Sequence, residues 1–265
     1  MLFSEHIGIA YSGAGSPTSP TEGIRVFSSR EDSGLALVDP SDKRGWTRKE
    51  LAEWLTAKLL GPSRVAVAVG HAFSFPEEFF RRMGIADWPA FLESFEQAWK
   101  TDSKSVEQGR EEAGDWVALE SELFNSSHKL RLCEKWTSSA KSVFHYKGPG
   151  SVYHSARAGL PWLAKIHGKA GGRAHFWPFD GFDVPDWKSL VAEVFPPMLR
   201  ARYEKALPAE HAGNRQRTHI LDAFSGASWL AEKDENGYID DYLHLLLEPV
   251  EIETVKREGW ILGVL

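Results

Sequence analysis

The sequence predicts an α/β protein built on a mixed, centrally buried sheet. Residues 65–69 are an unbroken run of Val and Ala that follows a helical segment. Such a run is typical of a strand that is covered on both faces and lies parallel to a neighbour. Residues 7–11, 23–28 and 34–38 are short, apolar or alternating, and separated by turn-forming residues, which indicates an antiparallel meander. With 265 residues, 42% of them hydrophobic, the chain can bury a substantial core, and we expect one domain over 1–265.

Composition narrows the class of protein before any motif does. The net charge of −6 argues against a broad basic surface for nucleic acid, although a local basic groove is compatible with it. No apolar run approaches the roughly 18 residues that cross a bilayer, and the N-terminus lacks a basic region followed by an apolar segment. Cys133 is the only cysteine, which excludes an intramolecular disulfide. We therefore expect a cytoplasmic protein that has no membrane partner.

A helix should join the meander to the strand at 65–69. Thr47 is a candidate N-cap, and Glu50 three residues later completes a capping box. Apolar residues then recur at helical spacing until Gly61 and Pro62, which should end the helix.

A mainly helical insertion is predicted at about 76–140. Aromatic residues at three- and four-residue spacing over 88–99 form an apolar face that we expect to lie in the core. Residues 101–114 are polar and show no apolar face, which favours a surface loop or lid.

The second half should continue the sheet. A glycine-rich basic loop at 141–152 precedes a helix with apolar residues at 160, 163 and 166. Residues 173–179 and 189–195 read as strands, and a further helix is expected from about 216 to 232.

Two loops could contact an anion. The turn at Ser12 and Gly13 follows the first strand and leaves backbone N–H groups accessible, although glycine-rich turns end many buried strands and a tight structural turn is the more common explanation. Lys147 lies in the basic loop ahead of a helix, where it could contact an anion or belong to a plain connector.

Three polar residues are candidates for chemistry. Glu193 lies inside an apolar strand, so its carboxylate must be paired, neutral or bound to a cation. His219 and Asp222 are three apart on one helical face, where they could address one metal or form a hydrogen-bonded pair.

The order of several short motifs resembles the ribonuclease H-like predicted nucleases grouped as domain-of-unknown-function family 429. The similar segments are 7–14, 67–76, 141–144, 148–152, 159–161, 192–196, 219–223 and 258–264. The resemblance covers most of the chain and implies a five-stranded mixed sheet with helices on both faces. It also implies a site for divalent metal, Mg²⁺ or Mn²⁺, that hydrolyses phosphodiesters.

This chain departs from that pattern at two strand ends. Ala10 and Gly70 stand where the similar proteins carry Asp, so this chain lacks the acid that the resemblance implies as the bridge between two metal ions. The resemblance leaves Glu193 and Asp222 as metal ligands, with His219 as a further ligand or proton shuttle. His71, beside Gly70, is an additional candidate ligand or a structural residue. Ser12, Ser74 and Lys147 are candidate phosphate contacts or ordinary turn and surface residues.

Three functions remain open at this point. The first is a metal-dependent nuclease or its degenerate descendant. The second is a catalytically silent protein that binds nucleic acid or a nucleotide in the same cleft. The third is a protein-interaction module that uses the Trp-rich middle segment.

Overall fold

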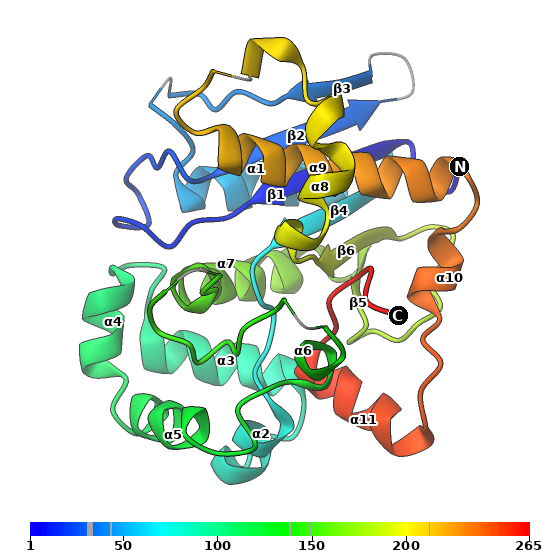
Figure 1. Ribbon diagram of the computed structural model, residues 1–265. Coiled ribbons are helices and arrows are strands. Elements are labelled where there is room, and N and C mark those ends of the chain that lie inside the picture. The colour runs from blue at the N-terminus through cyan, green and yellow to red at the C-terminus, as the bar shows by residue number, and fades with distance from the viewer. Residues whose placement is uncertain (31–33, 43, 138, 149, 212) are drawn as a thin grey trace.

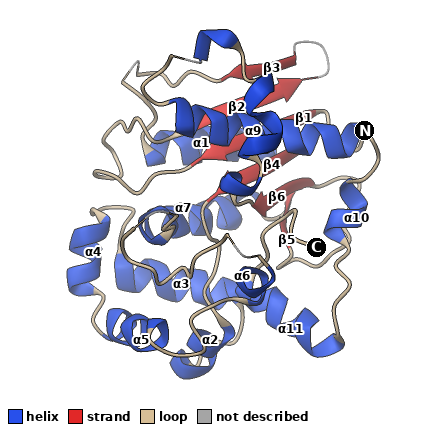
Figure 2. Cartoon of the chain, in the orientation of Figure 1, coloured by secondary structure: helices blue, strands red, loops and turns tan. Residues whose placement is uncertain are grey.

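A six-stranded mixed sheet forms the centre of the molecule. The computed structural model describes residues 1–30, 34–42, 44–137, 139–148, 150–211 and 213–265. The strands are β1 (Glu5–Ala10), β2 (Arg25–Arg30), β3 (Gly34–Leu37), β4 (Val65–Gly70), β5 (Ala174–Trp177) and β6 (Ser189–Glu193). They lie in the order β3-β2-β1-β4-β6-β5, and helices pack on both sides of them (Figures 1 and 2).

The strand directions confirm the predicted meander and the predicted parallel crossover. β1 pairs antiparallel with β2 and β2 with β3, whereas β1, β4, β6 and β5 are parallel neighbours. The five strands that the resemblance implies are one too few, because Ala174–Trp177, within the strand predicted at 173–179, forms a sixth at the edge beside β6. All four of its residues are buried, so this edge strand belongs to the core.

Two helical layers cover the sheet. One layer is α9 (Arg217–Glu235), which contacts β1, β2 and β4 and lies in front of them in Figure 1. Gly8 makes this approach possible, since a Cβ there would lie 2.0 Å from the carbonyl oxygen of Ala223. The opposite layer consists of α1 (Arg48–Leu60) and α7 (Tyr153–Ala170), which pack on each other.

The start of α1 is only partly as predicted. Thr47 is the N-cap and accepts a hydrogen bond from the N–H of Glu50 at 3.0 Å. The Glu50 carboxylate, however, accepts from the N–H of Ser41 at 2.8 Å. Glu50 therefore joins the helix to the preceding loop rather than closing a capping box, and the helix ends at Gly61 as expected.

The middle of the chain forms a group of short helices packed below α7 (Figure 1). The aromatic face at 88–99 is buried, as predicted. The expected loop at 101–114 is wrong, because Ser105 and Gln108 form a capping box that starts a short helix there. The helices of this group are α2 (Glu77–Met83), α3 (Trp88–Trp99), α4 (Val106–Glu112), α5 (Asp115–Phe124) and α6 (Leu132–Trp136).

The C-terminal part closes around β6 and α9. The remaining helices are α8 (Arg200–Tyr203), α10 (Ile239–Leu243) and α11 (Pro249–Glu258). Within the part of the chain that the structure describes, no helix combines the length and apolar character that a bilayer crossing requires.

Candidate functional site

The parallel strands bring three of the positions predicted from the sequence, Ala10, Gly70 and Glu193, together at the carboxyl ends of neighbouring strands. Ala10 pairs in register with Gly70, and Val69 pairs with Glu193. The carboxyl ends of β1, β4 and β6 therefore lie side by side, and among these three strand ends only β6 carries a carboxylate. The side chains nearby decide what this edge can bind.

Glu193 is held by a buried arginine. Its side chain is 5% exposed, and its two oxygens accept from Arg131 at 2.6 and 2.8 Å. The N–H of Phe73 donates to the same carboxylate at 2.9 Å. Of the three states open to a carboxylate in an apolar strand, the structure shows the paired one.

Arg131 connects Glu193 to a second acid. Its Nε donates to Glu134 at 2.9 Å, and the Arg131 side chain is 1% exposed. Burial raises the pKa of Glu134 to about 7, while the Arg131 charge acts in the opposite direction. One guanidinium thus serves two buried carboxylates at the start of α6.

Asp222 is also paired with an arginine. Arg200, at the start of α8, donates Nε and Nη2 to its two oxygens at 2.5 and 2.9 Å. His219 lies one turn earlier on α9 and is half-buried. Burial lowers the pKa of His219, the charges of Arg25 and Arg200 lower it further, and Asp222 opposes them.

The Ser12–Gly13 turn lies beside this histidine. A Cβ on Gly23 would lie 2.5 Å from the Cβ of Ser12 and 3.7 Å from Nε2 of His219. Gly13 itself packs against the backbone of His154, where a Cβ would come within 2.2 Å of the carbonyl oxygen. Ser12, His219 and Asp222 therefore share one corner of the molecule, which we call the α9 corner.

The α9 corner carries positive charge from side chains that the sequence did not single out. Arg25 begins β2, donates to the carbonyl of its neighbour Ile24 at 2.8 Å and is partly exposed. Burial lowers the pKa of Arg25, while Glu22 and Asp39 oppose that effect. Arg25 and Arg200 both act electrostatically on His219.

The other three candidate residues, Ser74, Lys147 and His71, form none of the contacts that define the α9 corner. Ser74 is fully buried and donates to the carbonyl of Arg257 at 2.5 Å. Lys147 is exposed, with Nζ 5.0 Å from the ring centre of Tyr146; residue 149 of the same loop lies outside the described residues. His71 is buried on the α1–α7 side, and burial lowers its pKa to about 4.

The chemistry of this edge does not fit two divalent ions. Ala10 and Gly70 offer no side-chain donor, and both remaining acids are engaged in two-point contacts with arginine. Among the described residues, no group of three or more His, Cys, Asp or Glu side chains is placed to hold a metal ion. The residues at these strand ends therefore do not fit a two-metal hydrolytic centre.

The arginine partners are the functional residues that sequence reasoning missed. Arg131 follows Leu130 and precedes Leu132 and Cys133. A charged residue among apolar neighbours is a signal of a buried ion pair. Arg200 directly follows an apolar pair and gives no comparable signal.

Comparison with known proteins adds no relative. Neither a family model, nor a curated protein, nor a solved structure matches this chain.

Proposed function

We propose that this chain is a ribonuclease H-like protein, related to domain-of-unknown-function family 429, that binds a phosphate-bearing ligand without two-metal hydrolysis. The ligand class is a nucleotide or nucleic acid. The observation that carries the proposal is the pairing of both remaining acids, Glu193 and Asp222, with Arg131 and Arg200.

The pairing matters because it compensates the negative charge that a metal site needs. Two hard cations require several uncompensated carboxylate oxygens close together. Here Arg200 pairs with Asp222, Arg131 pairs with Glu193 as well as Glu134, and the strand ends at Ala10 and Gly70 contribute no acid. The strand ends therefore carry less of the negative charge that would repel a phosphate than a two-metal site does.

The α9 corner supplies groups that suit an anion. Arg25 and His219 are partly exposed, and the Ser12 hydroxyl lies next to them. These groups can donate hydrogen bonds to phosphate oxygens, with Arg25 adding permanent positive charge. The fold gives further support, since an antiparallel meander followed by parallel strands agrees with the mixed sheet that the family resemblance implies.

The Trp-rich segment gives little support to an interaction module. Trp88, Trp99 and Trp116 are 1%, 0% and 7% exposed, so they build the core of the helical insertion. Trp136 is the exposed tryptophan of that segment, at 45%.

Binding and cleavage should be measured on the same preparations. Labelled single-stranded DNA, duplex DNA, RNA and an RNA–DNA hybrid are titrated by fluorescence anisotropy in EDTA, and cleavage is assayed with Mn²⁺ or Mg²⁺. We expect metal-independent binding to at least one probe that weakens with salt, and no cleavage. Arg25→Gln should weaken binding about threefold or more, because a phosphate contact is lost.

Arg81→Gln is the matched control. Arg81 is an exposed arginine on α2, paired with Glu78, and its loss should leave the affinity unchanged. Metal-dependent cleavage that disappears in Glu193→Gln would refute the proposal and restore the nuclease hypothesis. Equal losses in Arg25→Gln and Arg81→Gln would refute the α9 corner as the binding surface.

A further inference from the structure

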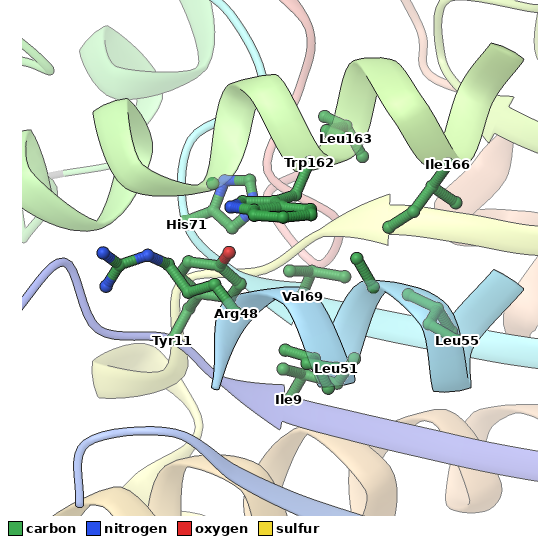
Figure 3. Close-up of a pocket in the computed structure, with 12 residues that line it drawn as sticks. Ile9, Tyr11, Arg48, Leu51, Leu55, Val69, His71, Trp162, Leu163 and Ile166 are labelled. Atoms are coloured by element: carbon green, nitrogen blue, oxygen red, sulfur yellow. The ribbon is translucent and has the colours of Figure 1, made fainter. Parts of the chain in front are cut away.

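A narrow cavity lies between the sheet and the layer of α1 and α7, on the opposite face from the α9 corner (Figure 3). Leu51 and Leu55 of α1 and Ile166 of α7 line its aliphatic part, and as it stands it has room for about one water molecule. The polar side chains lie together at its other end, beside the strand ends (Figure 3). The cavity is therefore amphipathic.

Three polar atoms at that end have no hydrogen-bond partner among the described residues. They are the hydroxyl of Tyr11, Nε of Arg48 and Nε1 of Trp162, all of them buried. Figure 3 shows the Tyr11 hydroxyl pointing toward the rings of His71 and Trp162. Because buried polar groups are nearly always paired in folded proteins, three unpaired ones around one cavity indicate a missing acceptor.

The chemistry of the three groups defines that acceptor. Arg48 Nε and Trp162 Nε1 can only donate. Burial raises the pKa of Tyr11, so its hydroxyl stays protonated and can donate as well. The partner must therefore offer at least three acceptor lone pairs in a small volume.

The charge of Arg48 adds a second requirement. Its side chain is 1% exposed, and its two terminal nitrogens donate to the carbonyls of Ala14 and Gly15 at 2.9 Å. No carboxylate of the described residues lies within ion-pair distance of it, and Glu107 acts on its charge only from further away. A buried positive charge without a counter-ion in contact favours an anion at this position.

We propose that this cavity binds a short-chain aliphatic carboxylate. The carboxylate accepts from Tyr11, Arg48 and Trp162, and the alkyl group lies against Leu51 and Ile166. One positive charge matches one negative charge. Binding requires the aliphatic side chains to move apart, because the free cavity has room for only about one water molecule, and this limits the tail to a few carbon atoms. A phosphate would carry more charge than the site neutralises.

The test uses the full chain and a series of sodium salts. Acetate, propionate, butyrate and octanoate are titrated by calorimetry and by thermal shift at constant ionic strength, with sodium chloride and 1-propanol as controls. We expect a saturable response to the acids with two to four carbons, and none to chloride, propanol or octanoate. A ligand that binds the folded state alone raises the melting temperature with concentration.

Two variants each remove one donor. Tyr11→Phe and Trp162→Phe should each weaken propionate binding about tenfold or more, because a hydrogen bond to a charged group is lost. Tyr11→Phe should leave the melting temperature of the free protein unchanged, since the hydroxyl it removes is unpaired there, whereas Trp162→Phe also loses packing and should lower it. Tyr238→Phe and Trp187→Phe, at side chains 55% and 58% exposed, are the matched controls and should bind normally.

The outcomes decide the proposal. The absence of a saturable response to any acid, or an equal response to chloride, overturns it and leaves a buried water or a simple ion at the polar end. Unchanged affinity in both donor variants overturns it as well. Arg25→Gln should bind propionate like the wild type, so that failure of the phosphate proposal and failure of this one are distinguishable.

Discussion

Replacing Glu193 with methionine should destabilise the protein by about 3 kcal/mol. Breaking a buried ion pair typically costs about 3–5 kcal/mol, because the remaining charge loses its partner. Arg131 keeps Glu134 at 2.9 Å, which favours the lower end of that range. The N–H of Phe73 also loses its acceptor, which adds to the loss.

A double-mutant cycle isolates the pair. Arg131→Met should cost at least as much, because it leaves both Glu193 and Glu134 without their shared guanidinium. The double variant removes both members of the pair, so its loss should fall short of the sum of the single losses by about 2 kcal/mol. Urea unfolding at pH 7 gives the four free energies, and the slopes of the transitions check that the unfolded state is comparable.

Additive losses in this cycle would refute the reasoning. So would a loss of less than about 1 kcal/mol in Glu193→Met, because the carboxylate would then contribute little to the fold. A Glu193→Met variant of normal stability that no longer responds to Mn²⁺ would instead assign Glu193 to a metal.

Three further predictions concern single positions. Gly159→Ala should lower the free energy of unfolding by about 1–3 kcal/mol, because the new Cβ would lie 2.4 Å from Nε2 of His71. Gly168→Ala, on the same helix, is the control: its Cβ meets no atom within 4 Å, and the free energy of unfolding should rise by up to about 1 kcal/mol. Equal effects of the two substitutions in urea unfolding would contradict this. The pKa of His71 is lowered from 6.5 to about 4, so between these values the unfolded chain binds a proton that the folded chain does not. Stability should therefore fall by about 3 kcal/mol as the pH drops from about 6.5 to about 4, and His71→Phe should flatten this part of the pH profile unless His71 is not the titrating group. Asp234 accepts from the N–H groups of Leu2 and Phe3 at 2.6 and 2.9 Å, so Asp234→Ala should cost about 1–3 kcal/mol and speed amide exchange near the N-terminus; unchanged exchange there would contradict the contact.

Local signals in the sequence predicted most of the elements. The β-branched run at 65–69 and the Thr47 cap act within a few residues, and both are where they were expected. The prediction of a loop at 101–114 was wrong because Ser105 and Gln108 form hydrogen bonds with the backbone N–H groups at the start of a helix. That helix buries only Val106 and Gly109, so it shows no apolar face in the sequence. Short helices of that kind depend on tertiary packing more than on periodicity.

The sequence predicted that the Glu193 carboxylate needs a partner, but it did not predict which residue that partner is. The apolar strand around Glu193 required a partner for the carboxylate, and the partner comes from Arg131, 62 residues earlier in the chain. Nothing in local spacing connects two such positions. The cavity beside Tyr11 and Trp162 likewise depends on the packing of α1 against α7, which no single segment encodes.

The last turns of the chain complete the network around β6, and this affects assembly during synthesis. Leu262 donates its N–H to the Glu193 carbonyl at 2.8 Å, and the Glu258 carboxylate accepts from the N–H groups of Glu77 and Leu132. A ribosome releases residues 258–264 after all the strands, so the growing chain can form the sheet before this end of β6 is covered. The backbone of Glu193 gains its pairing with Ile261 and Leu262 only at that late stage.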